Sequence, residues 1–314
     1  MSVVTTFAVL FVSLIVLAKS ADLVVKNLIR TANAIRLSTF VVSFLVLGLA
    51  TSTPEFFVGI NSALDKTPQL SLGNTIGATI VLLTLITGLM AITSGKVVVD
   101  SVFAKKDLII MNFIILLPVA LLFDSKLSRL DAVIMFIAYG FYMLRVYNER
   151  HRLSHPISLN HKPGFLRSLL FLILGFVGLA IASNYAVHSA RSLAEFLKIP
   201  VLMVGVLVFS IGTNFPELIL TITAIRKKQK MIVLGNVMGS ATTNTLVIAL
   251  VALIQPFEIL DIRLFTVSVF FLATSVVTFS YFVKSKNQIT RPEGFALLSL
   301  YSFFLIAEII SKLI

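Results

Sequence analysis

The sequence contains no cysteine, and its 314 residues include only four histidines. The absence of cysteine excludes disulfide bonds, and it excludes thiolates as nucleophiles or metal ligands. Three of the four histidines fall within one polar stretch, residues 147–164. A transition-metal site built on imidazole nitrogens is therefore not expected either.

Charged residues are also scarce, at 13% of the chain, while 58% of the residues are hydrophobic and the mean hydropathy is +1.02. A soluble domain is typically about half apolar and about a quarter charged, so this composition indicates a membrane protein. The net charge of +12 does not point to nucleic acid, because lysines and arginines in short loops orient membrane proteins. The amino-terminal apolar run lacks a basic leader, so we expect a transmembrane helix there rather than a cleaved signal.

Long apolar runs divide the chain into candidate transmembrane helices, since about 20 apolar residues span the hydrocarbon core. Ten such runs are predicted, at residues 3–28, 38–64, 70–93, 107–123, 130–147, 165–189, 200–225, 231–254, 263–283 and 293–312. The longest polar break lies between the fifth and sixth runs. We therefore expect an all-α integral membrane protein with a five-helix unit over 1–147, a linker over 148–164 and a second five-helix unit over 165–314.

Basic residues are distributed unevenly among the predicted loops. The odd-numbered loops hold 18 lysines and arginines, whereas the even-numbered loops and the carboxyl terminus hold seven. Positively charged loops remain in the cytoplasm. The bias therefore predicts that the odd loops, including the central linker, are cytoplasmic and that both termini lie outside. We expect the membrane to be the plasma membrane.

Two short motifs recur in the two units at a constant spacing. The stretch ATSTPEF at 50–56 has a partner, GTNFPEL, at 212–218, and LGNTIGA at 72–78 has a partner, LGNVMGS, at 234–240; both offsets are 162. Across the aligned window around them, 12 of 47 pairs are identical without a gap. Such internal similarity indicates a repeat. Because each unit has an odd number of helices, the second unit must be inverted, as in many secondary transporters.

The first motif places a proline inside an apolar helix. Pro54 has no amide hydrogen, so the carbonyl of Ala50, four residues earlier, loses its helical partner, and Pro216 does the same to Gly212. We therefore expect the second and seventh helices to be broken, with carbonyl oxygens freed to face an ion at each break.

The same motif supplies side-chain oxygens beside the expected break. Thr51, Ser52 and Glu55 fall at i, i+1 and i+4 and share one helix face. A charge at the membrane centre costs roughly 2.5–3.5 kcal/mol on insertion scales, so Glu55 and its partner Glu217 are candidate functional residues. Their oxygens are hard donors that suit Na⁺, Ca²⁺ and Mg²⁺. One such kink could be packing alone, but two symmetry-related copies favour a cation site.

The second motif has glycines spaced as Gly-x-x-x-Gly in both units. This spacing lets helix backbones approach closely, so we expect these helices to press against the broken ones. The asparagine in each copy either binds a carbonyl at the break or contacts the ion. Ser240 and Asn244 follow on one helix face, whereas the aligned Ala78 and Leu82 offer no ligand, so the expected site is asymmetric.

These motifs resemble those of the cation/Ca²⁺ exchanger superfamily, whose best-known branch is the sodium/calcium exchangers. The family's motifs resemble G-T-S-x-P-E and G-N-x-x-G-S-N, and this chain has ATSTPE with GNTIGAT and GTNFPE with GNVMGSA. The resemblance covers essentially the whole chain and implies ten helices in two inverted halves with a central cytoplasmic loop. It also implies that Glu55 and Glu217 coordinate the transported cation near the membrane centre.

The resemblance implies further oxygen ligands for the cation. The positions that match are Thr51, Ser52, Thr213, Asn214, Ser240 and Asn244. Asn214 replaces the usual serine, Ala78 stands where a serine is expected, and Leu82 stands where an asparagine or aspartate is expected. Two carboxylates remain, which balance one Ca²⁺ or two monovalent cations.

The sequence therefore predicts a secondary cation antiporter that exchanges Ca²⁺ for Na⁺ or H⁺ by alternating access at a site between Glu55 and Glu217. Burial disfavours the charged form of a carboxylate, which lets protons compete for such a site. The expected partners are inorganic cations and the lipid bilayer, with no nucleic acid and no cofactor beyond the transported ions. The oligomeric state stays open.

Three alternatives follow from the same residues. An exchanger fold that has lost transport, or changed its cation, would agree with Leu82 and Ala78. A channel is disfavoured because no long ring of polar residues is present to line a pore. An intramembrane protease would need a Ser/His or Asp/Asp pair within the helices, and His188 is the only candidate histidine. We therefore expect no enzyme.

Overall fold

The computed structural model describes residues 3–32, 44, 47–98, 107–151, 165–226, 230–259, 263–286 and 288–311. The helical segments of the first half are α1 (Val3–Ala32), α3 (Gly48–Thr51), α4 (Thr53–Leu64), α5 (Pro68–Ile80), the π-helical η3 (Val81–Ile86), α6 (Thr87–Ser94), α7 (Asp107–Leu121), η4 (Leu122–Asp124) and α8 (Arg129–His151). Those of the second half are α9 (Phe165–Leu197), α10 (Val201–Val204), the π-helical η5 (Gly205–Phe209), α11 (Ser210–Thr213), α12 (Phe215–Arg226), α13 (Lys230–Ile254), α14 (Arg263–Lys286) and α15 (Arg291–Ile310). The strands are β1 (Lys96–Val98), β2 (Lys126–Leu127), β3 (Phe257–Glu258) and β4 (Gln288–Thr290).

Eight helical stretches of the described chain are long and apolar enough to cross a membrane, and Leu108–Asp124 is a shorter apolar helix. A helix lies in each of the ten predicted ranges, although the start of the range 38–64 is outside the described residues. The prediction of a helical, multi-pass membrane protein is therefore confirmed. α8 continues to His151, so the first residues of the predicted linker 148–164 are helical, and its remainder lies outside the described residues.

The structure contains two antiparallel strand pairs that the sequence analysis did not predict. β1 pairs with β4, with Lys96 opposite Thr290, and β2 pairs with β3, with Lys126 opposite Glu258. Along the chain α7 separates β1 from β2, and α14 separates β3 from β4, so the two pairs lie toward opposite ends of these helices. Each pair joins one strand from each half of the chain and supplies partners for backbone groups beyond the helix ends.

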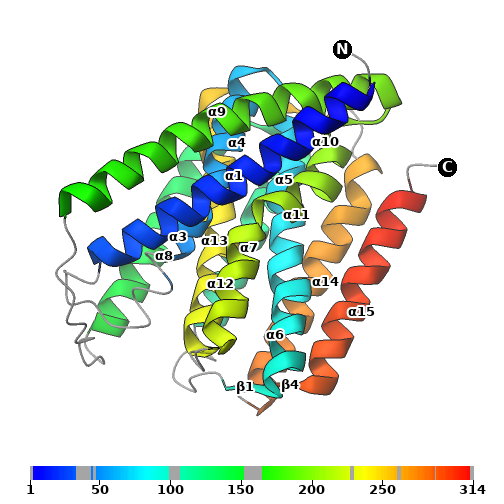
Figure 1. Ribbon diagram of the computed structural model, residues 1–314. Coiled ribbons are helices and arrows are strands. Elements are labelled where there is room, and N and C mark those ends of the chain that lie inside the picture. The colour runs from blue at the N-terminus through cyan, green and yellow to red at the C-terminus, as the bar shows by residue number, and fades with distance from the viewer. Residues whose placement is uncertain are drawn as a thin grey trace.

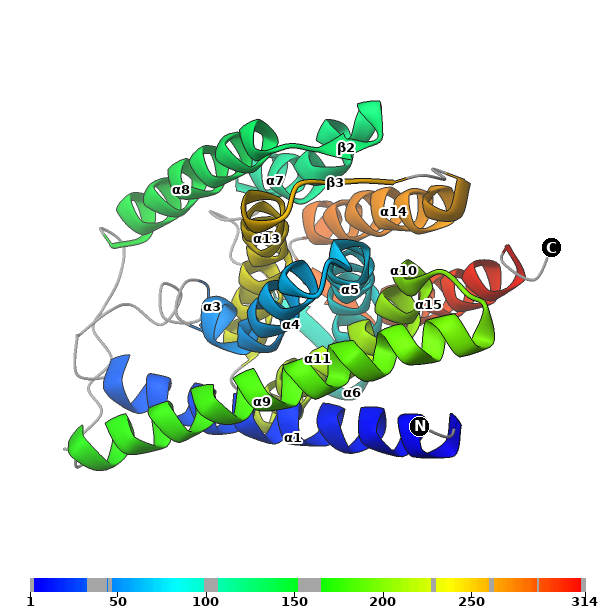
Figure 2. The same cartoon turned by 90° about the horizontal axis from the view of Figure 1, so that it is seen from above.

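The helices form three layers, which Figure 2 shows from above. The long helices α1 and α9 lie side by side on one face, and α7 and α8 lie on the opposite face. Between these faces stand α4, α5, α11 and α13, with α14 and α15 at one side. Figure 1 shows α1 and α9 tilted across the more upright helices behind them.

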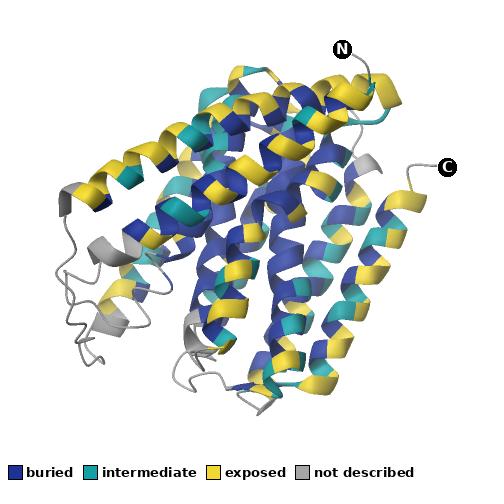
Figure 3. Ribbon diagram, viewed as in Figure 1, coloured by how far each residue is buried: buried dark blue, intermediate teal, exposed yellow. Residues whose placement is uncertain are grey.

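Buried residues concentrate in the central helices, whereas the outer helices α1, α9 and α15 alternate buried and exposed residues along their length (Figure 3). Their exposed positions include large apolar side chains such as Phe11, Ile173 and Phe303. Helices that are apolar on both their inner and outer faces are typical of membrane spans. The central helices therefore hold the candidate site away from lipid.

α1 and α9 pack against each other at small residues. A Cβ atom on Gly175 would lie 2.6 Å from Val24 Cγ2, and Gly178 faces Ser20 in the same way. Small residues of this kind let membrane helices approach closely. An apolar cluster built mainly from these two helices is distinct from the larger cluster of the remaining helices. The α1–α9 pair is thus a packing unit with one helix from each half.

Candidate cation site

The helix breaks predicted from Pro54 and Pro216 are present in both halves. Ser52 separates α3 from α4 with φ −77° and ψ 5°, and Asn214 separates α11 from α12 with φ −84° and ψ 6°. The break lies two residues before each proline. π-Helical geometry precedes both breaks, in η5 and at Phe44, and such turns are frequent at functional sites. The predicted breaks at the two proline motifs are confirmed.

The carbonyl of Ala50 is not left without a donor, which corrects the expectation of an unpartnered oxygen at that atom. It accepts a hydrogen bond of 2.7 Å from the Thr53 hydroxyl. Phe215, which aligns with Thr53 in the second half, has no hydroxyl. The two breaks therefore have the same backbone geometry but different carbonyl environments.

Glu55 and Glu217 lie in the first turns of α4 and α12, and each is only 1% exposed. A helix N-terminus favours a nearby carboxylate. Oε2 of Glu55 and both carboxylate oxygens of Glu217 have no hydrogen-bond partner among the described residues. Burial of unpaired carboxylates is costly unless a cation or a proton compensates the charge.

Each glutamate is close to a threonine hydroxyl of the opposite half, and Glu217 is also close to the Ser240 hydroxyl of its own half. The Thr213 hydroxyl lies beside Glu55, and the hydroxyls of Thr51 and Ser240 lie beside Glu217. The two carboxylates are also close enough to interact electrostatically with each other. The structure thus brings together five of the predicted site residues at one place between the halves.

The threonines before the breaks bind the asparagines of the second motif across the halves. The Thr51 hydroxyl lies 3.1 Å from Asn236 Oδ1 and 2.9 Å from Ser240 Oγ. The Thr213 hydroxyl lies 3.1 Å from Asn74 Oδ1. The expected contact with a carbonyl at the break is not made, because Nδ2 of Asn74 and of Asn236 has no partner among the described residues. Each amide oxygen instead accepts from a threonine of the opposite half.

The remaining predicted ligands also carry buried oxygens without a donor. Ser52 Oγ has no partner in the described chain, and neither has Oδ1 of Asn214 or Asn244. Nδ2 of Asn214 donates to the carbonyl of Ser210 at 2.7 Å. In Asn214 and Asn244 the amide nitrogen is occupied, and the oxygen is the atom that remains available.

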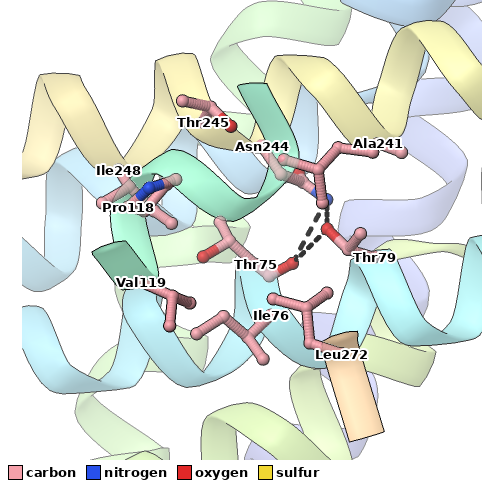
Figure 4. Close-up of a pocket in the computed structure, with 11 residues that line it drawn as sticks. Thr75, Ile76, Thr79, Pro118, Val119, Ala241, Asn244, Thr245, Ile248 and Leu272 are labelled. Atoms are coloured by element: carbon pink, nitrogen blue, oxygen red, sulfur yellow. Dashed lines mark hydrogen bonds between the residues drawn. The ribbon is translucent and has the colours of Figure 1, made fainter. Parts of the chain in front are cut away.

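Asn244 is held by two threonines of α5 that the sequence analysis did not single out. Its Nδ2 lies 3.0 Å from Thr79 Oγ1 and 3.3 Å from the carbonyl of Thr75. Figure 4 shows these contacts at the edge of a small pocket that Pro118 and Leu272 also line. Thr75 lies within the second motif and Thr79 directly follows it, four residues later on the same helix face, which is the signal that could have identified them.

The glycines of the second motif press against the broken helices, as predicted. A Cβ atom on Gly77 would lie 2.6 Å from the carbonyl oxygen of Val206, and one on Gly239 would meet the carbonyl of Phe44. Phe44 and Val206 are themselves 162 positions apart. The same close contact therefore occurs once in each half, and it brings the second motif of one half to the break of the other.

Within the described residues, no group of three or more histidine, cysteine, aspartate or glutamate side chains could hold a metal ion. The candidate site has two carboxylates, surrounded by neutral hydroxyl and amide oxygens. Oxygen-only donors suit hard cations such as Ca²⁺ and Na⁺ better than Zn²⁺ or copper. The donor set fits a small hard cation.

Comparison with known proteins identifies the family. The sequence model of the family described as sodium/calcium exchanger protein matches residues 5–148 and, a second time, residues 167–310. The chain belongs to this family. The two matches start 162 positions apart, the offset that relates the motifs. The resemblance inferred from the motifs is therefore confirmed, and the family is one of membrane ion transporters rather than of enzymes.

Individual relatives cover nearly the same length. The sodium/calcium exchanger MaX1 of Methanosarcina acetivorans is 27% identical, over 97% of this chain and 98% of the relative. The inner membrane protein YrbG of Escherichia coli is 27% identical, over 80% of this chain and 81% of the relative. A solved structure of the sodium-calcium exchanger NCX_Mj is 26% identical, has a TM-score of 0.70, and covers 98% of this chain and 99% of its own.

Proposed function

We propose that this protein is a secondary antiporter that exchanges Ca²⁺ for Na⁺ or H⁺ at a central site between Glu55 and Glu217. The observation that carries the proposal is the pair of buried carboxylates, one from each half, with three of their four oxygens lacking a hydrogen-bond donor in the described chain. Such a pair is stable when a divalent cation lies between its members. Membership in the exchanger family supports the same reading.

The proposed ligands are the two glutamates and the oxygens arranged around them. They are Glu55, Glu217, Thr51, Ser52, Thr213, Asn214, Ser240 and Asn244. Six of these eight lie at or within four residues of a helix break, where the backbone leaves the regular helical path. Ser240 and Asn244 come from α13, which packs against α3 and α4 of the first half.

We further propose ten spans in two inverted repeats, over residues 1–147 and 165–314, joined by the linker 148–164. The strand pairs support this topology. The offset of 162 carries Lys126 and Leu127 of β2 onto residues 288 and 289 of β4, and it carries β1 onto the end of β3. The repeat thus relates one strand pair to the other, which lies toward the opposite end of the bundle, as inversion requires.

The distribution of lysines and arginines among the loops assigns the sides of the membrane in this proposal. The odd-numbered loops face the cytoplasm, both termini lie outside, and the membrane is the plasma membrane. In Figure 1 the start of α1 and the end of α15 lie toward the upper end, and β1 and β4 lie at the lower end. The loops that contain β1 and β4 are both odd-numbered, in agreement with one cytoplasmic side.

Transport would proceed by alternating access, with α1 and α9 moving over the other helices. The separate packing of this pair against the central layer supports that division. The counter-ion must neutralise the same two carboxylates before the emptied site can return. Ala78 and Leu82 give no oxygen donors, which weakens the case for several Na⁺ ions at once and keeps H⁺ as a counter-ion. The proposed partners are inorganic cations and the lipid bilayer, with no nucleic acid and no cofactor.

The test is uptake of radioactive Ca²⁺ into proteoliposomes with an outward Na⁺ gradient, an outward H⁺ gradient or no gradient. Glu55→Gln and Glu217→Gln, which keep side-chain volume, serve as matched variants. Gradient-driven uptake by the wild type and its loss in both variants is the expected result, and the effective gradient names the counter-ion. Folded protein without uptake under any gradient would instead support an exchanger fold with another cation or with a scaffold or sensor role.

A further inference from the structure

Thr221 is a buried hydroxyl for which the proposed site gives no role. It follows Glu217 by four residues on α12, so the two side chains share a helix face. Thr221 is 1% exposed, and its Oγ1 has no hydrogen-bond partner among the described residues. A buried hydroxyl without a partner destabilises the folded state, so its retention calls for an explanation.

Ser71 is a second such hydroxyl, in the other half. It lies on α5, is fully buried, and its Oγ has no partner in the described chain. A Cβ atom on Gly59 would lie 3.3 Å from Ser71 Oγ. Gly59 follows Glu55 by four residues on α4. The Ser71 hydroxyl therefore lies beside the helix turn that follows Glu55, as Thr221 lies on the turn that follows Glu217.

The repeat relates these two places. The offset of 162 carries Gly59 onto Thr221, and it carries Ser71 onto Val233. Each half thus has one hydroxyl beyond its glutamate, supplied by the neighbouring helix in the first half and by the broken helix itself in the second. The two halves therefore have a hydroxyl at equivalent places, although residues at non-equivalent positions in the sequence supply it.

Other buried hydroxyls on these helices bond to carbonyls one turn earlier. Ser62 donates to Gly59, Thr75 to Ser71, and Thr79 to Thr75. This is the usual way for serine and threonine to be satisfied inside a helix. Ser71 and Thr221 do not do so, which leaves both oxygens available to another partner.

We propose that the Ser71 and Thr221 hydroxyls are the last oxygens that a cation meets before it reaches the glutamates, from the outer and the inner side respectively. This inference rests on the proposed function and its topology. α4 leads from Glu55 to the even-numbered loop that follows Leu64, and α12 leads from Glu217 to the odd-numbered loop that follows Arg226. The two hydroxyls then lie on opposite sides of the carboxylate pair. Both are buried here, so ions reach each one only when the surrounding helices part.

The absence of cysteine makes a direct test available. Ser71→Cys and Thr221→Cys each introduce a single thiol of similar size into the full-length protein. A membrane-impermeant, positively charged methanethiosulfonate is applied to intact cells and, separately, to inside-out vesicles. Leu72→Cys and Leu234→Cys are the controls: both residues are buried, Leu72 adjoins Ser71 on α5, and Leu234 is its repeat-related counterpart on α13.

We expect Ser71→Cys to react from the outside only and Thr221→Cys from the inside only, each at least about tenfold faster than the controls, whose thiols react only through local unfolding. Saturating Ca²⁺ should slow both reactions. Reaction of both thiols from the same side, or at the rate of the controls, would overturn the inference. If either variant fails to fold, Ser71→Ala and Thr221→Val replace it, and each should raise the Ca²⁺ concentration for half-maximal transport on its own side of the membrane.

The outcomes also separate this inference from the proposed function. One-sided reaction without any protection by Ca²⁺, in a protein without uptake, would support the proposed outer and inner routes past Ser71 and Thr221. It would also show that Ca²⁺ is not the transported ion. Normal Ca²⁺ uptake by the wild type, with thiols that react like the controls, would contradict the proposed routes past Ser71 and Thr221. It would still support the proposed exchanger function.

Discussion

The Thr51 hydroxyl, one residue before the break in the first half, lies 3.1 Å from Asn236 Oδ1 on α13 of the second half. The repeat reproduces this contact between Thr213 and Asn74, also at 3.1 Å. Each half therefore positions the break of the other. A site assembled in this way depends on both halves at every step, and the following predictions test that dependence.

Thr51→Val should weaken the contact between the halves, because it leaves the buried Asn236 oxygen without its donor. An unsatisfied buried polar group costs about 1–3 kcal/mol, so the melting temperature of the detergent-solubilised protein should fall. Thr51→Ser keeps the hydroxyl and should retain most of the stability. Equal melting temperatures for the valine variant and the wild type would show that this hydrogen bond contributes nothing.

Glu55→Gln and Glu217→Gln should remove stabilisation by Ca²⁺ while leaving the fold intact. A ligand that binds only the folded state stabilises it by about 2.7 kcal/mol at 100 times its dissociation constant. Addition of Ca²⁺ should therefore raise the melting temperature of the wild type and leave that of each variant unchanged. A full thermal shift in either variant would exclude that glutamate as a ligand.

Gly77→Ala should disrupt packing at the second break. The added Cβ would lie 2.6 Å from the Val206 carbonyl and 2.7 Å from Ser210 Cβ, distances that force the two helices apart. Overpacking of this kind costs typically about 1–3 kcal/mol. Gly140→Ala is the matched control, because nothing lies within 4 Å of a Cβ at that position. The comparison is made by thermal unfolding and by Ca²⁺ uptake, and equal losses in both variants would contradict the prediction.

Thr79→Val should impair Ca²⁺ binding through Asn244, since the threonine accepts a hydrogen bond from the Asn244 amide. Loss of a bond worth about 0.5–1.5 kcal/mol should weaken Ca²⁺ binding roughly two- to tenfold. Thr79→Ser keeps the acceptor and should restore binding. A serine variant as weak as the valine variant would assign the effect to packing at this position rather than to the orientation of Asn244.

The breaks and the glycine contacts could be predicted because their causes are local. Pro54 and Pro216 cannot donate a hydrogen bond to the preceding helical turn. The Gly-x-x-x-Gly spacing can be recognised in the sequence without knowledge of the partner helix. The internal offset then indicated that Glu55 and Glu217 would occupy equivalent places. These features need only the chain and its periodicity.

Other features depend on contacts that no local pattern encodes. Thr53 occupies the Ala50 carbonyl, although the proline alone predicts a free oxygen. The strand pairs join segments of two or three residues that lie 130 or more positions apart, and such short strands carry no alternating pattern. The hydrogen bond between Asn244 and Thr79 likewise joins residues 165 positions apart. Tertiary packing decides all three.

The strand pairs have a consequence for how the duplicated chain can be divided. β1 finds its partner in β4 and β2 finds its partner in β3, so each half alone would expose two unpaired edges as well as the glycine surfaces that receive the opposite break. Two halves produced as separate polypeptides should therefore be recovered folded only when they are synthesised together. The family model matches each half once, and the contacts between the halves lead us to expect that the two halves unfold together and that neither is an independent domain.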